Sequence, residues 1–467
     1  MGIFDALNTS VGGLQAQSFA LQNISGNIAN AQTTGFKGIN TSFVDLVPEA
    51  TNPDRQVAGG VTAYARQTVS TQGTVSASTV GTFMAINGDG FFSVQKSSGT
   101  VDNTPVFTGV TDYTRRGDFQ VNANGNLVNG AGYFLMGVPV DSKTGNPLGN
   151  VPQVLQFQNS FVPAQATSTI QYGLNLPATP VTAAASTAAA GTITAAGGLD
   201  VADFTAGHDP TVAGTGQVIG NDATIFQNES ISGGAVTAYD ASGTPVNLQL
   251  RWAKTDSSAL GGSHVDTWNL FYQKDPLATG TQVAWVNAGT DFTFGSNGKL
   301  TSPTSPSITL TGVAVGGQTL GNIAVSIGAS GLTQFATTGG TATINQISQN
   351  GYPAGQLQSV AISNSGLVIG TFSNGQNIDL ASVTLSHFNG TNYLKALDGG
   401  AYAVTDQSGP AIAGASGTIS GSSLEGSNTD IADEFTKLIV TQQAYSANTK
   451  VITTANSMVQ DLLNVLR

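Results

Sequence analysis

The C-terminal segment decides the fold: residues 431–466 read IADEFTKLIVTQQAYSANTKVITTANSMVQDLLNVL. Two rows of residues with a spacing of seven run through it, one apolar or aromatic throughout and one with polar residues at its centre. One row is Ile431, Leu438, Tyr445, Ile452, Val459 and Leu466. The other row begins at Phe435 and ends at Leu463, with Gln442, Thr449 and Asn456 between them. A repeat of this period predicts a long helix with a coiled-coil seam, in which the polar members of the second row would set the register.

The N-terminal segment has the same period. Its heptad row is Leu7, Leu14, Leu21 and Ile28, and Asp5 is the only charged residue before Lys37. This pattern predicts an amphipathic helix whose polar side is uncharged, although a freely solvated helix usually carries more charge. One interpretation is that both terminal helices pack on the chain's own core. A narrow seam buries few side chains, however, so we expect neighbouring copies of the chain to order them.

The region between the helices is rich in β-strand and turn patterns. The chain contains 59 glycines and only 9% charged residues, and turn signals such as 87–90 and 124–126 separate apolar runs between residues 83 and 140. Strand patterns return at 235–240, 248–252 and 268–272, after an Ala/Thr/Gly-rich stretch at 181–234 that we expect to form loops. The expected fold is therefore mainly β globular domains nested in one another, with N- and C-terminal α-helices forming a coiled-coil-like assembly domain.

The patterns also suggest where the domains begin and end. We expect a helical assembly domain at 1–32 and 429–467, and an extended or β connecting region at 33–82 and 413–428. An inner β domain is expected at 83–157 and 345–412, with an outer β domain inserted at 158–344. Such an insertion is tolerated when its two ends meet at the surface of the host domain.

Composition argues against several functional classes. The net charge is −12 without a basic cluster, so nucleic acid is not an expected partner, and no apolar run is long enough for membrane insertion. There is no cysteine, and the three histidines, at 208, 264 and 387, lack the spacing of a metal pair. No nucleophile elbow, phosphate loop or dinucleotide fingerprint is present. We therefore predict no catalytic residue, no metal site and no cofactor.

Both ends of the chain resemble one family. Residues 23–37, NISGNIANAQTTGFK, resemble the N-terminal signature of bacterial flagellar rod and hook axial proteins, with matches at Asn27, Asn30, Gly35, Phe36 and Lys37. The C-terminal stretch is similar to the matching signature at the other end. Its matches are residues 425–428, Glu434, Phe435, Leu438, Ile439, Gln442, Ala444, Tyr445, Asn448 and 462–464.

The middle of the chain resembles the hook members of that family, which carry a large inserted outer domain. The stretches 351–357 (GYPAGQL) and 369–376 (IGTFSNGQ) are similar to the return of the hook members into their inner domain. The resemblance implies a non-enzymatic subunit of a homopolymer, the flexible tubular hook of the flagellum, with distal rod, hook cap and hook–filament junction proteins as partners. It also implies export through the type III apparatus without a cleaved signal peptide, to the extracellular hook at the basal body.

The residues expected to mediate self-assembly combine the heptad rows and the signatures. They are Leu7, Leu14, Leu21, Ile28, Asn27, Asn30, Gly35, Phe36, Lys37, Ile431, Phe435, Leu438, Tyr445, Asn448, Ile452, Val459, Leu463 and Leu466.

Three alternatives remain open at this point. A distal rod or junction axial protein of the flagellum would share both termini, and only the large insertion argues against it. A secreted β-rich adhesin would explain the Gly/Thr-rich body but not the paired signatures. An enzyme within the middle domain would need a convergent set of acid, base or nucleophile, and none is visible.

Overall fold

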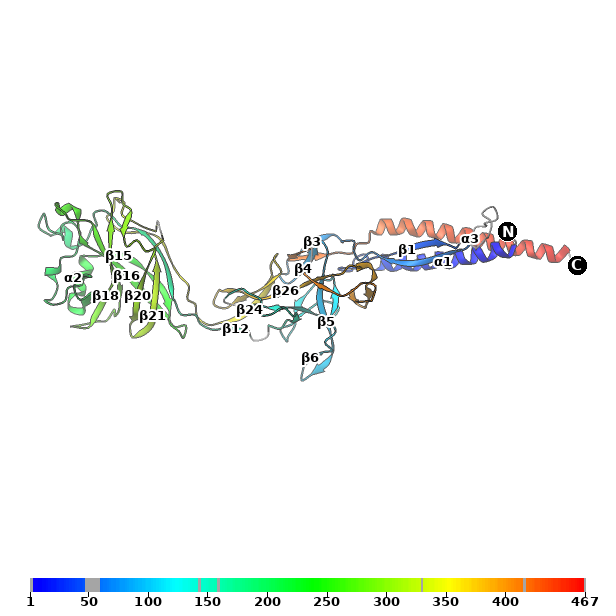
Figure 1. Ribbon diagram of the computed structural model, residues 1–467, viewed down its shortest axis with the longest axis horizontal. Coiled ribbons are helices and arrows are strands. Elements are labelled where there is room, and N and C mark those ends of the chain that lie inside the picture. Colours follow the sequence, from blue (N-terminus) through cyan, green and yellow to red (C-terminus); the bar gives the residue numbers. More distant parts are fainter. Residues whose placement is uncertain are drawn as a thin grey trace. The chain divides into compact units, whose positions relative to one another are not determined.

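The computed structural model describes residues 3–46, 59–141, 144–157, 160–328, 331–414 and 417–465. Strands predominate, and one long helix lies near each terminus (Figure 1), which confirms the predicted fold class. The chain divides into two compact units. Unit 1 comprises Met1–Ser160 and Leu357–Arg467, and unit 2 comprises Phe161–Gln356.

The terminal segments of unit 1 form a helix pair with a hairpin beside it. Helices α1 (Ile3–Ala29) and α3 (Ile431–Val465) run side by side, and the antiparallel hairpin of β1 (Ile39–Asp45) and β2 (Val61–Gln67) lies against α1 (Figure 1). The side chain of Asp430 accepts a hydrogen bond from the backbone N–H of Ala432 at 2.7 Å and so caps the start of α3.

The rest of unit 1 is a β body that joins the two halves of the chain. Two short ladders pair segments that are more than three hundred residues apart: β3 (Val75–Ala77) with β32 (Ser423–Glu425), and β4 (Met84–Asn87) with β31 (Thr418–Gly421). The main sheet has the order β24 (Gly355–Ile362), β25 (Leu367–Phe372), β26 (Asn377–Val383), β10 (Tyr133–Pro139), β5 (Phe91–Val101), β7 (Asp112–Thr114), β29 (Ala401–Ala403) and β28 (Lys395–Ala396). Shorter strands extend it: β6 (Thr104–Phe107), β8 (Gln120–Val121), β9 (Leu127–Val128), β11 (Gln153–Val154), β27 (Leu385–His387) and β30 (Ile412–Ala413). Phe92, Leu135 and Val368 lie in its core.

Unit 2 is built from two sheets that share one core. The first sheet has the order β14 (Gln217–Ile219), β18 (Val283–Phe294), β17 (Thr267–Gln273), β16 (Pro245–Asp256) and β15 (Ile231–Tyr239), with β19 (Leu300–Ser302) beside β18. The second has the order β20 (Ser307–Val315), β21 (Gln318–Ser326), β13 (Thr169–Asn175) and β22 (Leu332–Thr333), with β23 (Thr343–Gln349) on β13. Trp252, Trp268 and Tyr172 are buried in the shared core.

The C-terminal boundary of unit 2 differs from the expected one. The unit runs to Gln356, past the predicted end of the outer domain at 344. Strand β23 belongs to unit 2 because it pairs with β13 along its whole length, from Asn175↔Thr343 to Ile170↔Gln349. Its sequence, TINQISQ, is mostly polar and exposed, so it shows little of the apolar alternation that reveals a strand.

The Ala/Thr/Gly-rich stretch at 181–234 consists mostly of turns and short helices, but it is more than surface loops. It contains η2 (Ala184–Ser186), η3 (Val201–Asp203), η4 (Gly220–Asp222) and α2 (Ala223–Asn228). Leu199, Phe204 and Phe226 from this stretch are buried against Phe271 and Trp285 of the first sheet. The segment therefore contributes a second core to unit 2.

A protonated carboxyl group helps to hold this segment in place. Glu229 is buried, and its carboxyl accepts the backbone N–H of Asp200 at 3.0 Å. Burial, followed by the hydrogen bond with Asp203, raises the pKa of Glu229 to about 8. This raised pKa favours the protonated form of Glu229, which the hydrogen bond with Asp203 stabilises.

Candidate assembly site

Small and polar side chains line the seam between α1 and α3. The buried positions of α1 are Ser10, Gly13, Ala16, Ala20, Ile24 and Asn27. A Cβ atom at Gly13 would lie 2.9 Å from Nδ2 of Asn448 on α3, so the Asn448 side chain packs directly against Gly13 across the seam. The predicted leucine row lies beside the seam instead, because Leu7, Leu14, Leu21 and Ile28 are all half-buried.

On α3, three members of the first predicted row lie partly against α1, whereas Ile431 and Tyr445 of that row are 41% and 40% exposed. Leu438, Ile452 and Val459 of the first row are half-buried, as is Asn448. Among the α3 side chains that the structure describes, the buried ones are Glu434, Thr441 and Ala455, which belong to a heptad row one residue before the predicted second row. Phe435 and Leu463 of that second row are 49% and 63% exposed, so this row does not line the contact between α1 and α3. Leu466 lies outside the described residues.

Asn27 connects three elements at the end of the seam. Its side chain exchanges two hydrogen bonds with the backbone of Ile39, at 2.9 Å and 3.0 Å, and it donates to Oε2 of Glu434 at 3.1 Å. The other oxygen of Glu434 accepts a hydrogen bond from Lys437 at 2.6 Å. Asn27 therefore joins α1, the β1–β2 hairpin and the first turns of α3.

Three charged side chains form a buried group at the junction of the helix pair and the β body, here called the Glu425 cluster. Nζ of Lys37 lies 2.6 Å from Oε1 of Glu425, and Nη1 of Arg115 lies 3.4 Å from Oε2. Lys37 also donates to the carbonyl of Thr71 at 2.7 Å, and Glu425 also accepts the backbone N–H of Gly73 at 2.9 Å. The side chains of Lys37 and Glu425 are completely buried, so each charge depends on its partners.

The electrostatics of Lys37 reflect this burial. Burial lowers the pKa of Lys37 from its usual value, and the nearby carboxylate of Glu425 opposes that shift. Arg115 is further stabilised because its guanidinium lies 5.4 Å from the centre of the Phe91 ring. The Glu425 cluster thus brings together the N-terminal signature, the β body and the C-terminal signature.

The remaining signature residues shape the chain around this cluster. Gly35 has φ +66°, and a Cβ atom there would lie 2.9 Å from the backbone N of Arg116, so glycine is required on both counts. Asn30 donates to the carbonyl of Gly26 at 3.0 Å and closes the end of α1. Phe36 is half-buried, and its carbonyl accepts the N–H of Asn428 at 3.2 Å.

Several residues of the site are absent from the predicted set of assembly residues. Asn428 accepts the N–H of Gly38 at 2.8 Å and donates to the carbonyl of Thr68 at 3.0 Å, so it ties the two terminal segments together. Glu425 and Asn428 stand within the C-terminal signature, which was the signal that could have identified them. Arg115 and Gly13 show no comparable signal in the sequence.

Large apolar side chains of α3 face solvent on both sides of the seam. At about 100° of rotation per residue, Ile431, Phe435 and Ile439 form one stripe, and they are 41%, 49% and 55% exposed. Val440, Val451 and Met458 form the other stripe, with exposed fractions of 60%, 45% and 50%. Tyr445, near the middle of α3, is exposed as well. The helix pair therefore leaves an apolar surface uncovered on two sides.

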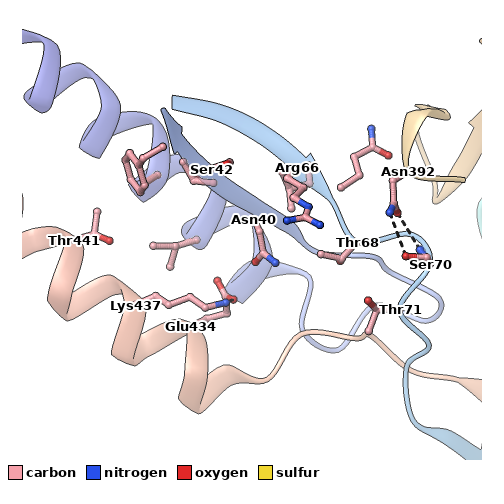
Figure 2. Close-up of a pocket in the computed structure, with 16 residues that line it drawn as sticks. Asn40, Ser42, Arg66, Thr68, Ser70, Thr71, Asn392, Glu434, Lys437 and Thr441 are labelled. Atoms are coloured by element: carbon pink, nitrogen blue, oxygen red, sulfur yellow. Dashed lines mark hydrogen bonds and ion pairs between the residues drawn. The ribbon is translucent and has the colours of Figure 1, made fainter. Parts of the chain in front are cut away.

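A groove of about 640 Å³ lies beside the helix pair (Figure 2). Asn40, Ser42 and Arg66 of the hairpin form one wall, and Glu434 and Lys437 of α3 form the other. Residues 68–71, which follow β2, close one end of the groove, where Asn392 accepts the N–H of Ser70 at 3.1 Å and donates to its hydroxyl at 3.2 Å.

Other kinds of site find no support in the described part of the chain. Its histidine, aspartate and glutamate side chains form no group of three that could hold a metal ion. Of the helices within the described ranges, none has the length and hydropathy required to cross a bilayer.

Four family descriptions match the chain in order from end to end. They are "Flagella basal body rod protein" at residues 7–37, "Flagellar hook protein FlgE/F/G D1 domain" at 85–195, "Flagellar basal body protein FlaE D2 domain" at 222–352 and "Flagellar basal body rod FlgEFG protein C-terminal" at 420–465. The first and last of these contain Asn27, Lys37 and the whole of α3.

Relatives are similar over their full length. The flagellar hook protein FlgE of Brucella suis is 28% identical over 100% of both chains. The FlgE proteins of Salmonella typhimurium and Escherichia coli are 28% and 27% identical, each over 98% of this chain and 100% of the relative. With matches to all four parts and relatives that align from end to end, this chain belongs to the family of bacterial flagellar rod and hook axial proteins.

Proposed function

We propose that the chain is a structural subunit that polymerises with copies of itself into the flagellar hook, and that it has no enzymatic activity. The observation that carries this proposal is the apolar surface on both sides of the α1–α3 seam. A monomer would expose Phe435, Ile439 and Val440 to water, whereas a neighbour on each side would bury them. Full-length similarity to proteins named as hook proteins supports the hook over the shorter rod members.

The two stripes favour an open polymer over a closed dimer. A two-fold dimer buries one self-complementary patch of each copy and would leave the second stripe exposed. Contacts between unlike surfaces continue from copy to copy and generate a helical filament when the rotation does not close. The eighteen assembly residues named from the sequence remain part of this proposal. Those on the stripes would contact neighbours, and those in the seam and the Glu425 cluster would position the stripes.

We also propose the distal rod, hook cap and hook–filament junction proteins as partners, and the type III apparatus as the export route. The absence of cysteine supports this route, because the chain then passes through in an unfolded state and folds outside without forming disulfides.

The adhesin alternative is weaker than the hook proposal. The chain contains an Arg-Gly-Asp tripeptide at 116–118, which is an adhesion sequence when its two charges are free. Arg116 and Asp118 instead bind each other, with Nε–Oδ1 and Nη2–Oδ2 distances of 2.7 Å and 2.9 Å.

The double variant Ile439→Asp/Val440→Asp tests the proposal, because it places one carboxylate on each side of α3. Burying either charge against a neighbour would cost several kcal/mol, so we expect polymerisation to stop while the monomer stays folded. Sedimentation and negative-stain electron microscopy of the purified full-length chain measure this. Leu277→Asp, at a position 83% exposed in unit 2, is the control and should polymerise normally. Tubes of ordinary length from the double variant would contradict the proposal.

A further inference from the structure

The last turns of α3 extend beyond the start of α1. Gly13 lies opposite Asn448, and Asn27 binds Glu434. The two helices are therefore antiparallel, and each step forward along α1 corresponds to one step back along α3. Counting from Gly13, this places Ile3, where α1 begins, opposite Met458. The described part of α1 therefore has no residue opposite 459–465, here called the overhang (Figure 1). Asp461 and Asn464 on the overhang are exposed, and they share one face of the helix because they are three residues apart.

The groove beside the hairpin carries a cation that is not neutralised. Glu434 is paired with Lys437 at 2.6 Å and also binds Asn27. Arg66 extends from β2 into the groove (Figure 2) and forms no ion pair with any residue that the structure describes. Gln67, which also lines the groove, has a buried Oε1 without a hydrogen-bond partner among the described residues. The groove thus offers a positive charge and a vacant acceptor.

The overhang and the groove of one chain cannot meet. Glu434 lines the groove and Asp461 lies on the overhang of the same straight helix, and at ~1.5 Å per residue the two are separated by roughly 40 Å. One end of the helix pair therefore presents an exposed carboxylate, and the other end presents a groove with an unpaired guanidinium.

We propose that the overhang of one copy docks in the groove of the next copy, with the carboxylate of Asp461 facing the guanidinium of Arg66. The inference rests on the proposed polymeric function and specifies the contact along the polymer axis. Opposite charges on the two surfaces favour this orientation and disfavour contacts between like ends. Because the two surfaces differ and lie at opposite ends, each docking leaves a free overhang and a free groove, so the contact repeats without closing.

A cysteine pair tests the contact directly, because the chain has no cysteine of its own. Ser42→Cys in the groove and Asn464→Cys on the overhang, on the same helix face as Asp461, should form a disulfide between copies when the full-length polymer is oxidised. A disulfide requires Cα atoms less than about 7 Å apart, so the pair cannot close within one chain. We expect a ladder of covalent multimers on non-reducing gels. Polymers of either single variant should instead run on the gel mainly as monomers, because their subunits are not cross-linked into a ladder. Asp406→Cys with Asn464→Cys is the matched control and should give no ladder.

Charge reversal provides a second, independent measurement. Asp461→Arg and Arg66→Asp should each raise the critical concentration for polymerisation about tenfold, and the combined variant should return most of the way to the original value. A missing ladder, an equal ladder from the control pair, or a combined variant no better than either single one would overturn the docking while leaving the hook proposal intact. Failure of the unmodified chain to polymerise at all would instead refute the proposed function, and the docking with it.

Discussion

Replacing Glu425 with alanine should lower the free energy of unfolding of unit 1 by about 3–5 kcal/mol. The variant removes the partner of two buried cations, since Lys37 and Arg115 both bind this carboxylate at 2.6 Å and 3.4 Å. It also leaves the N–H of Gly73 without its side-chain acceptor. Water cannot replace the lost carboxylate easily, because the side chain of Lys37 is fully buried.

Urea denaturation followed by two signals measures this loss. Circular dichroism follows both units, whereas tryptophan fluorescence follows unit 2 alone because Trp252, Trp268 and Trp285 all lie there. We expect Glu425→Ala to lower the urea midpoint of the unit 1 transition, which is seen by circular dichroism alone. The unit 2 transition, which is also seen by fluorescence, should stay where it is. Asp256→Ala is the control, since its partner His264 is half exposed, and it should cost about 1 kcal/mol or less. Equal losses in the two variants would mean that the Glu425 cluster does not join the helix pair to the β body.

Gly13→Leu should abolish polymerisation while both β units remain folded. A Cβ atom at this position already comes within 2.9 Å of Nδ2 of Asn448, so a leucine has to displace the Asn448 side chain and overpack the seam, at a cost of about 1–3 kcal/mol. The helix pair cannot absorb such a loss, because the apolar residues buried on it are limited, among those described, to Ala16, Ala20, Ile24 and Ala455.

Gly26→Leu is the matched control on the same helix. A Cβ atom there meets nothing within 4 Å among the described residues, so this variant should polymerise like the original chain. Sedimentation measures polymerisation, and tryptophan fluorescence checks that unit 2 is intact. If both leucine variants polymerise equally well, close packing at Gly13 is not what positions the helix pair.

Period and composition were sufficient to predict both terminal helices and the β body, but not the contact between the helices. The heptad rows drew attention to Leu7, Leu14 and Phe435, which are large and apolar. Two helices approach most closely where side chains are small, however, so Gly13 and Ala16 occupy the seam and the large residues lie on its flanks. A pattern of hydrophobicity shows that a face is buried somewhere, without showing whether the same chain covers it.

The Glu425 cluster illustrates a second limit. Lys37 belongs to a recognisable signature, but its partners Glu425 and Arg115 are charged residues far away in the sequence, and no local period relates them. Pairing of this kind depends on the β3–β32 and β4–β31 ladders, which bring the two halves of the chain together. Similarly, Leu199 and Phe204 are isolated apolar residues in a weakly patterned stretch, and only the adjacent sheet turns them into a core.

Amide hydrogen exchange of α1 and α3, compared between the monomer and the polymer, tests the central claim most directly. That claim is that the helix pair acquires its stability from neighbouring copies. We expect residues 3–29 and 431–465 to exchange rapidly in a proven monomer, while β4 and β31 are protected, and both helices to become strongly protected in the polymer. Strong protection of both helices in the monomer, or exchange that polymerisation leaves unchanged, would contradict the account.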